Sequence, residues 1–556
     1  MSCTHPNSQR SAVSRSQTLA MNRISAVTSH VAGSPDPTAE PAAAAAEPAP
    51  PPGLEEMAPT LLSDAQMIEF VKNGFVVLPL PELSPEYHAK CADSIMNPWE
   101  KNDRNNNWIG NNIYPANADL GPVLATPTVR GALSSVLGPD YAFHAHRALH
   151  VSGSNDQGFH KDTPEGGGPI KHMRPRWAMI MYAPARDGHP SACPPATLSC
   201  SQRLVRRYYP AGSTLEMGPT CILPGGQYWS VDPDKGGEVA QSMGAALGLS
   251  EFKVTTPLAQ GTCILIHFHM YHRGSARLEN PERTEPWAVS REGPAPMRPM
   301  VKFQFYSVSE PTQPNWDAGP LGQPGAKADW GELDGVHGAC ADSPQVTAVW
   351  DDILGWLRGD KLLTAPPSAP SALAETVAEF ETEDVAGEPR RMGCAFLVGR
   401  EAGGGSGAAL AALEDALRSD KPARQRCGIW GSVGAGDAAT PTLLGMLGET
   451  DLGLVTRAGT ALGESSQHPS IEVVEVIGAT IERLLALTDL AAEGLSLEFV
   501  KAERQLATFA SKGTKERYRR PEWHAMDVLA QALWCADIPT HLPIIHLCSV
   551  LLKLTS

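Results

Sequence analysis

Gly158-Phe159-His160-Lys161-Asp162 is the stretch that says most about this chain. Alternate side chains of an extended segment point the same way, so His160 and Asp162 can reach one metal ion from the same face of a strand. Two imidazoles and one carboxylate on one face of an iron ion leave three positions open for an oxidant and a co-substrate. The triplet therefore predicts a metal site whose third ligand comes from a distant segment.

The His-x-Asp triplet is weak by itself, because a chain of 556 residues should contain about one by chance. The competing interpretation is a histidine at the end of a strand and an aspartate that caps a turn. The sequence around the triplet has to distinguish the two.

Length and composition exclude several classes of protein. At 556 residues the chain is too long for a single core and should form two or three domains. The hydrophobic content is 42% but no apolar run approaches a membrane span, so we expect a soluble intracellular protein. The net charge of -16, without any block of Lys and Arg, argues against nucleic acid as a partner. The 11 cysteines include no Cys-x-x-Cys pair, which favours reduced, buried thiols.

Residues 1–58 are predicted to lie outside the folded domains. Residues 1–35 contain three arginines, many Ser and Thr, and no acidic residue, which is typical of an organellar transit peptide. Arg23-Ile24, followed five residues later by His30-Val31, is close to an amino-terminal peroxisomal signal. A disordered segment without a targeting signal would have the same composition. The sequence therefore leaves open whether the protein is located in a peroxisome, in another organelle or in neither. An Ala/Pro-rich linker over residues 36–52 follows.

Folded structure is predicted to begin near Leu61, in a first domain over residues 59–312. Ser63 or Asp64 can cap a helix that Asn73-Gly74 ends, and a strand follows at once. Further on, short runs rich in β-branched and aromatic residues alternate with Gly/Pro turns, at Trp177–Pro184, Thr220–Leu223, Cys263–Phe268 and Pro299–Val308. This spacing predicts an all-β barrel or sandwich with helices at its start.

The rest of the chain is predicted to be helical. Residues 313–385 read as a linker with one short helix, and residues 386–556 as an all-α domain. A weak repeat places Gly399, Gly431 and Gly463 at intervals of 32 residues (431 - 399 and 463 - 431). This period resembles HEAT-like stacked helix pairs, to which a protein partner could bind, although an ordinary helical bundle fits as well.

Two more segments complete an ordered set of motifs. They are Gly261–Gly274, which contains three histidines, and Arg298–Tyr306, which alternates polar and apolar residues. Together with the opening helix and strand and the His-x-Asp triplet, they make residues 60–310 resemble the phytanoyl-CoA dioxygenase family of Fe(II)/2-oxoglutarate oxygenases. The resemblance implies a double-stranded β-helix, which is a jelly-roll or cupin-like barrel, with flanking helices. It also implies a dioxygenase that uses Fe(II), 2-oxoglutarate and O2 to hydroxylate an unactivated C–H bond of a small-molecule or acyl substrate.

By position in this resemblance, His160 and Asp162 are the first two iron ligands and His272 is the third. His272 is preferred to His267 and His269 because the turn that follows it matches the turn after the family's distal ligand. In a continuous strand, moreover, His267 and His269 would face the side opposite to His272.

The resemblance also implies a cation for the distal carboxylate of 2-oxoglutarate. Arg298 opens the strand after the distal histidine, as the family's arginine does, and guanidinium pairs with carboxylate through two parallel hydrogen bonds. Its separation of 26 residues from His272 (298 - 272) is larger than the family's usual spacing and implies an inserted loop. Lys302, Gln304 and Tyr306 share the strand face of Arg298.

Other assignments follow from the same resemblance or compete with it. Tyr182 and Ser275 are further candidates for the co-substrate pocket. Asp162 indicates hydroxylation, because family relatives that transfer halide lack this carboxylate. One alternative is a cupin-type metal enzyme that does not use 2-oxoglutarate. Another is a degenerate barrel that acts as an interaction protein through its helical repeats.

Overall fold

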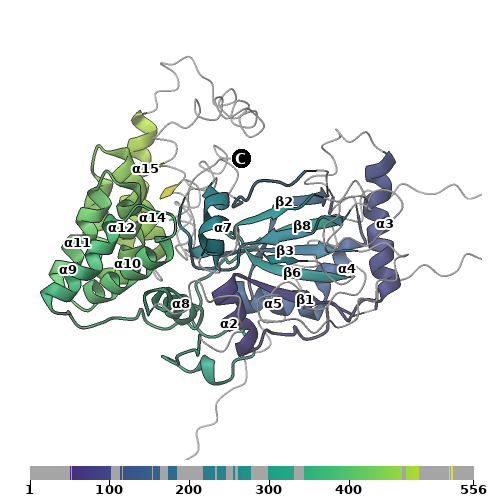
Figure 1. Cartoon of the computed structure of the whole chain (residues 1–556). Coiled ribbons are helices and arrows are strands. Elements are labelled where there is room, and N and C mark those ends of the chain that lie inside the picture. The colour runs from purple at the N-terminus through teal and green to yellow at the C-terminus, as the bar shows by residue number, and fades with distance from the viewer. Residues whose placement is uncertain are drawn as a thin grey trace, which may run out of the picture.

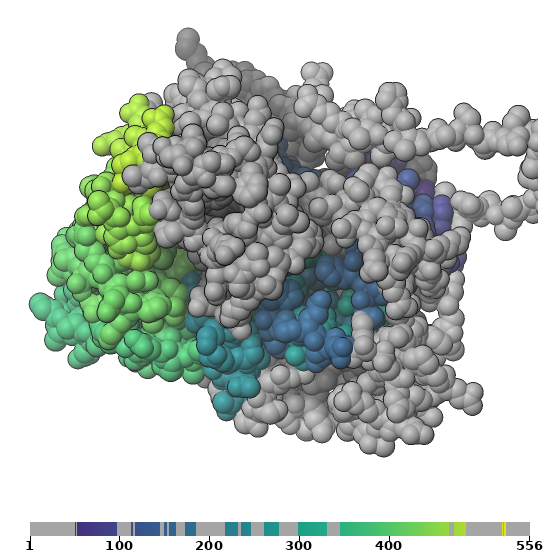
Figure 2. All heavy atoms as spheres, turned by 90° about the horizontal axis from the view of Figure 1, so that it is seen from above, coloured from purple at the N-terminus to yellow at the C-terminus, as the bar shows by residue number. Residues whose placement is uncertain are grey.

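The computed structural model places the described part of the chain in a strand-rich region and a helical region (Figure 1). The residues that it describes are 50–51, 53–101, 113–114, 117–152, 155–162, 173–184, 217–231, 235–245, 254–256, 261–276, 298–330, 344–465, 471–487, 525 and 528–529. The predictions on residues 1–49, including the targeting signals, lie outside this set. Figure 2 shows the strand residues in blue and teal between the helical region in green to yellow and the N-terminal helices in purple.

Two antiparallel sheets form the strand-rich region. The larger has the strand order β1-β6-β3-β8-β2, and the smaller has the order β5-β4-β7. The strands are β1 (Phe75–Pro79), β2 (Ala142–Val151), β3 (Trp177–Ala183), β4 (Thr220–Ile222), β5 (Val254–Thr256), β6 (Thr262–His267), β7 (His272–Gly274) and β8 (Pro299–Tyr306). Ile222 of the smaller sheet packs with Met179, Ile264 and Met300 of the larger one, so the sheets face each other across an apolar layer. The predicted all-β arrangement of two facing sheets is confirmed in this coarse form.

Helices cover the outer faces of both sheets. They are α2 (Asp64–Asn73), α3 (Pro85–Lys101), α4 (Leu120–Ala125) and α5 (Pro127–Leu137) on the larger sheet, and α7 (Gly236–Ala245) on the smaller. Val301 and Phe303 of β8 pack toward the first group, in the same cluster as Leu133 of α5. Since side chains alternate along a strand, Lys302 and Gln304 point toward the smaller sheet.

The opening helix has the ends that the sequence predicted. Ser63 is the N-cap of α2 and forms a capping box with Gln66. Gly74 ends the helix in the left-handed conformation at φ 79°, and its N–H donates to the Phe70 carbonyl. A Cβ at Gly74 would lie 1.9 Å from Cε of Met270, so both the conformation and the space require glycine.

The helical region runs from α8 to α15. Its helices are α8 (Pro344–Leu357), α9 (Pro370–Ala378), α10 (Glu388–Gly403), α11 (Gly407–Arg418), α12 (Pro422–Ala435), α13 (Thr440–Leu447), α14 (Leu452–Ser465) and α15 (Ile471–Leu487). The repeat glycines lie on α10, α12 and α14, and α12 contacts both of the others. A Cβ at Gly399 would lie 2.2 Å from the Gly431 carbonyl oxygen, so these glycines allow two helix backbones to touch. The HEAT-like assignment and the domain boundaries stay predictions.

Residues 313–330, part of the predicted linker, pack against the strand-rich region. The Trp316 indole N–H donates to Asp64 at 2.7 Å, and Lys72 Nζ donates to the Trp330 carbonyl at 2.6 Å. The Trp330 ring packs beside Trp350 of α8. One apolar cluster therefore runs from the strand-rich region into the helices.

Two further sequence predictions concern cysteines and membrane insertion. The described cysteines are buried and free, at Cys91, Cys221, Cys263, Cys394 and Cys427. Within the described residues, none of the helices combines the length and the apolar character needed to cross a bilayer.

Replacement of Gly399 tests the close contact between α10 and α12. We expect Gly399→Ala to lower the free energy of unfolding by about 1–3 kcal/mol, because the added methyl group would overlap the Gly431 carbonyl. A Cβ at Gly478 of α15 would have no described atom within 4 Å, so Gly478→Ala should raise the free energy of unfolding by roughly 0.5–1 kcal/mol. Denaturant unfolding measures the free energy of unfolding of both variants. If the two substitutions changed it equally, the close contact between α10 and α12 would be contradicted.

Candidate metal centre

Alternation of side chains positions the first two candidate ligands. Phe159 packs in the apolar cluster beneath α7, and Lys161 Nζ donates to the Trp229 carbonyl at 2.9 Å and lies over the Tyr271 ring. Both are therefore anchored on the α7 side of the smaller sheet. His160 and Asp162 consequently point to the opposite side, into the space between the sheets.

Backbone pairing positions the third candidate ligand. His160 and His272 exchange two backbone hydrogen bonds, with the His160 N–H donating at 3.1 Å and the His272 N–H at 3.0 Å. This bridge adds the triplet segment to the edge of the smaller sheet beside β7. Residues paired in this way place their side chains on the same face, so the two imidazoles lie side by side with ring centroids 4.7 Å apart.

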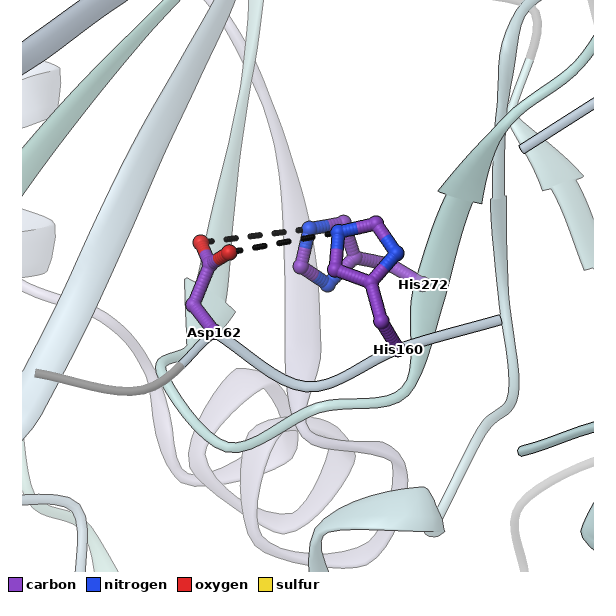
Figure 3. A group of neighbouring side chains, drawn as sticks. All are labelled: His160, Asp162 and His272. Carbon is purple, nitrogen blue, oxygen red and sulfur yellow. Dashed lines mark ion pairs between the residues drawn. The ribbon is translucent and has the colours of Figure 1, made fainter. Parts of the chain in front are cut away.

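The three side chains converge on one point (Figure 3). Nε2 of His160 lies 4.0 Å from Oδ1 of Asp162, and Nε2 of His272 lies 3.9 Å from Oδ2 of the same carboxylate. All three ligand atoms lie within 4.8 Å of one another. The structure thus brings together the three residues that the sequence predicted as metal ligands.

Both imidazoles are oriented by their own backbone. Nδ1 of His160 lies 2.9 Å from the Gly158 carbonyl oxygen, and Nδ1 of His272 lies 3.0 Å from the Met270 carbonyl oxygen. A carbonyl only accepts, so each Nδ1 carries the proton and each Nε2 presents a lone pair to the shared point. A hydrogen bond of this kind is what fixes the tautomer of a metal-binding histidine.

The charge states also suit a metal ion. Burial opposes ionisation of Asp162, but the neighbouring His272, Lys302 and His160 outweigh it and hold the pKa of its carboxyl well below the usual range. Burial lowers the pKa of His272 to about 4, so its imidazole is neutral at neutral pH. Metal ligands must be deprotonated in this way, and the residues present therefore fit a divalent ion such as Fe(II).

The expectation that His267, His269 and His272 lie on one continuous strand was wrong, although the structure does separate His267 and His269 from the triad. The chain is not one continuous strand here, because β6 ends at His267 and a turn leads into β7 at His272. The turn closes with the Met270 N–H donating to the His267 carbonyl at 3.1 Å. His267 Nε2 lies 3.2 Å from the Met173 carbonyl oxygen, as expected for a histidine bonded to its neighbours.

Arg298 is a buried cation at the start of β8. Its side chain is 4% exposed, and its Nε donates to the Gly218 carbonyl at 2.9 Å. Among the described residues, no carboxylate pairs with its guanidinium. Burial lowers its pKa to about 10, which still leaves it charged at neutral pH. A buried charge without a partner is costly, so this guanidinium favours an anionic ligand.

The other two predicted pocket residues are placed differently. Ser275 Oγ lies 2.9 Å from Sγ of Cys221, which belongs to the cluster beneath α7, so its hydroxyl is turned away from the triad. Tyr182 pairs with Val301 across β3 and β8 and shares its outer face, where its hydroxyl hydrogen-bonds to His88 Nδ1 at 2.7 Å. The structure therefore does not bring Tyr182 to the site, because its position on β3 directs it toward the helices.

Two residues lie at the site in addition to the predicted ligands and Arg298. Lys302 Nζ lies 2.6 Å from Oδ2 of Asp162. His150 of β2 pairs with Met300 of β8, so it shares a face with Lys302 and Arg298. Its Nε2 is buried with no hydrogen-bond partner among the described residues, and burial lowers its pKa to about 3. Strand alternation predicted the face of Lys302, whereas no sequence signal identified β2.

Comparisons with known proteins add little at the level of sequence. No family model and no curated protein matches the chain. The resemblance to the phytanoyl-CoA dioxygenase family therefore depends on the ordered motifs alone.

Solved structures similar to this chain include three from non-haem or iron-binding proteins. EctD from S. alaskensis with bound Fe is 15% identical, with a TM-score of 0.30 over 45% of this chain and 78% of that one. The alpha-ketoglutarate-dependent epimerase SnoN from nogalamycin biosynthesis is 11% identical, with a TM-score of 0.29 over 44% and 81%. The non-haem monooxygenase ThoJ in its Ni complex is 13% identical, with a TM-score of 0.25 over 44% and 80%. These TM-scores are low, so the site is assigned from its own side chains.

Loss of one imidazole tests whether the triad binds a metal. We expect His272→Ala to weaken Mn(II) binding by more than roughly 100-fold, which exceeds the usual effect of residues that only support a ligand. The measurement is metal content after equilibrium dialysis. His144→Ala is the control, because His144 is half-buried on β2 and packs against Trp177. Unchanged binding in His272→Ala, or equal loss in both variants, would contradict the site.

Proposed function

We propose that this chain is an Fe(II)- and 2-oxoglutarate-dependent dioxygenase that hydroxylates an unactivated C–H bond of a small-molecule or acyl substrate. The observation that carries the proposal is the convergence of His160, Asp162 and His272 on one point, with both Nε2 lone pairs directed there. Fe(II) held by these residues would supply redox chemistry toward O2 and three open coordination positions for the reactants.

Arg298 supports 2-oxoglutarate as the co-substrate. It lies on the same face of β8 as Lys302, whose ammonium contacts the candidate ligand Asp162. A buried guanidinium that pairs with no described carboxylate can bind the distal carboxylate of 2-oxoglutarate through two parallel hydrogen bonds. In the alternative of a cupin-type enzyme without this co-substrate, a different anionic ligand would have to compensate the buried charge.

The triad lies beside the apolar layer between the sheets, which includes Met179, Met181, Ile264, Ile266 and Met300. Asp162 and His272 are 14% and 7% exposed, whereas the His160 side chain is 41% exposed, so one side of the triad is open to solvent. Electrostatic contacts on the sheltered side are stronger than they would be in water. The chain's own contribution is thus to hold the ligands and to bind the co-substrate.

Hydroxylation is the reaction that Asp162 favours. Its carboxylate occupies the position that halide takes in the halide-transferring relatives of the family that the chain resembles. The strongly lowered pKa of Asp162 keeps this carboxylate ionised and available as a ligand. A degenerate barrel that only binds other proteins would have no need for these ionised and oriented groups.

The direct experiment is an anaerobic titration of purified protein with Fe(II) and then 2-oxoglutarate. We expect a weak visible charge-transfer band that needs both additions, and succinate formation once O2 is admitted. Absence of the band from folded protein that binds metal would contradict the role of 2-oxoglutarate and favour the cupin-type alternative. A screen of acyl and other small molecules for oxygenated products would then search for the substrate.

Substitution of Arg298 tests the co-substrate site separately from the metal site. We expect Arg298→Gln to weaken 2-oxoglutarate binding on the order of 100-fold, because two charge-assisted hydrogen bonds are lost. Mn(II) binding without 2-oxoglutarate should not be weakened, since Arg298 is not a ligand. Titration of the charge-transfer band and dialysis with Mn(II) give the two affinities. Equal 2-oxoglutarate affinity in the variant and the wild type would contradict the assignment.

A further inference from the structure

We propose that the charge of Lys302 strengthens the mutual dependence of metal binding and 2-oxoglutarate binding beyond what direct contact of 2-oxoglutarate with the metal provides. The inference rests on the proposed function and deepens it. It assigns to Lys302 an electrostatic role in the order and strength of ligand binding, as a residue that is not itself a metal ligand.

The position of Lys302 is the first observation. Its Nζ lies 2.6 Å from Oδ2 of Asp162, and the same oxygen lies 3.9 Å from Nε2 of His272. The side chains of Lys302 and Asp162 are 6% and 14% exposed, so solvent screens their charges weakly. A divalent ion held by the triad would therefore be a close neighbour of a buried ammonium.

The charge balance of the site is the second observation. The carboxylate of Asp162 contributes -1, and the two cations Lys302 and Arg298 contribute +1 each, so these three groups sum to +1 (-1 + 1 + 1). Nearby Arg273 pairs with Asp156 at 3.0 Å and adds no net charge. Lys302, Asp162 and Arg298 are thus largely buried groups that carry an excess of positive charge before any ligand enters.

The order of binding follows from this balance. A divalent ion alone would raise the sum to +3 (+1 + 2), which is costly in a buried site. The 2-oxoglutarate dianion would return it to +1 (+3 - 2). Two charges a few ångströms apart interact strongly at the effective dielectric constant of about 20 that suits protein sites. The ammonium of Lys302 should therefore weaken the binding of metal alone by roughly tenfold or more, and the dianion should relieve this effect.

The same balance predicts the reciprocal effect. If 2-oxoglutarate tightens metal binding by some factor, then the metal must tighten 2-oxoglutarate binding by the same factor. The excess positive charge should also let 2-oxoglutarate bind measurably to metal-free protein. Without the charge of Lys302, the net charge of Asp162 and Arg298 is 0 (-1 + 1). Metal alone should then bind more tightly, and the 2-oxoglutarate dianion alone should bind more weakly.

Mn(II) binding to wild-type, Lys302→Met and Lys302→Arg proteins tests the inference, with and without saturating 2-oxoglutarate. The readout is the EPR signal of free Mn(II), at a mildly alkaline pH where histidines are neutral. In Lys302→Met we expect Mn(II) alone to bind about tenfold more tightly, and the tightening by 2-oxoglutarate to fall about tenfold. Lys302→Arg keeps the charge and should behave as the wild type does.

A second measurement needs no variant. Isothermal titration of wild-type protein with 2-oxoglutarate in the presence of EDTA should show binding without metal, and added salt should weaken it. Unfolding midpoints of all three proteins check that they are folded. If a variant does not fold, this wild-type titration still tests the excess of positive charge on which the inference depends.

The outcomes separate the inference from the proposed function. Weaker binding of Mn(II) alone in Lys302→Met would show that Lys302 only positions Asp162, and would overturn the inference. The inference would also be overturned if 2-oxoglutarate tightened Mn(II) binding as much in Lys302→Met as in the wild type. It would equally be overturned if 2-oxoglutarate did not bind to wild-type protein in EDTA. If wild-type protein binds neither Mn(II) nor 2-oxoglutarate under any of these conditions, the proposed function itself fails.

Discussion

The pair of backbone hydrogen bonds between His160 and His272 is the contact on which the candidate site depends. It joins segments that are 112 residues apart (272 - 160) and places their imidazoles on one face of the smaller sheet. Because the side-chain period of a strand is two, a slip of one residue in this pairing would turn a ligand toward α7. Phe159 and Lys161 oppose such a slip, since one packs beneath α7 and the other is bonded to the Trp229 carbonyl. The residues between the ligands are therefore as necessary to the site as the ligands.

The site concentrates charged and polar groups in a space that is otherwise apolar. Asp162, Lys302 and Arg298 lie with His150 and His272 beside a layer of methionine and isoleucine side chains. Taking this many polar groups out of water is unfavourable unless ligands or partners compensate. Lys302 and Asp162 compensate each other. Among the described residues, Arg298 has a hydrogen bond to the Gly218 carbonyl but no carboxylate partner, and Nε2 of His150 has no hydrogen-bond partner. Folding stability alone would not favour this imbalance, which is typical of binding sites.

Local sequence signals predicted the parts of the structure that local chemistry determines. The capped helix before Gly74, the strands β3, β4, β6 and β8, and the placement of Lys302 on the strand face of Arg298 all follow from turn residues or from alternation. The three candidate ligands were predicted from a resemblance to an ordered set of motifs. Tyr182 was misplaced because its strand face depends on pairing with β8, which no local pattern determines. His150 was missed for a similar reason, since β2 is rich in polar residues and its register with β8 becomes apparent only once the sheet is formed.

The contacts between the two regions bear on what the helices do. Arg176, next to the start of β3, pairs with Glu310 at 2.8 Å and with Glu464 of α14 at 2.9 Å, and all three side chains are nearly fully buried. The Trp430 indole N–H of α12 donates to Ser230 Oγ at 2.9 Å, one residue after the carbonyl that anchors Lys161. A buried ion pair that loses one partner leaves an uncompensated charge, so removal of α14 would destabilise the start of β3. The face of the helical stack that carries Glu464 and Trp430 is therefore committed to the strand-rich region, and a protein partner would have to bind elsewhere on the helices. Through these contacts the helices support the start of β3 and the segment whose carbonyl anchors Lys161.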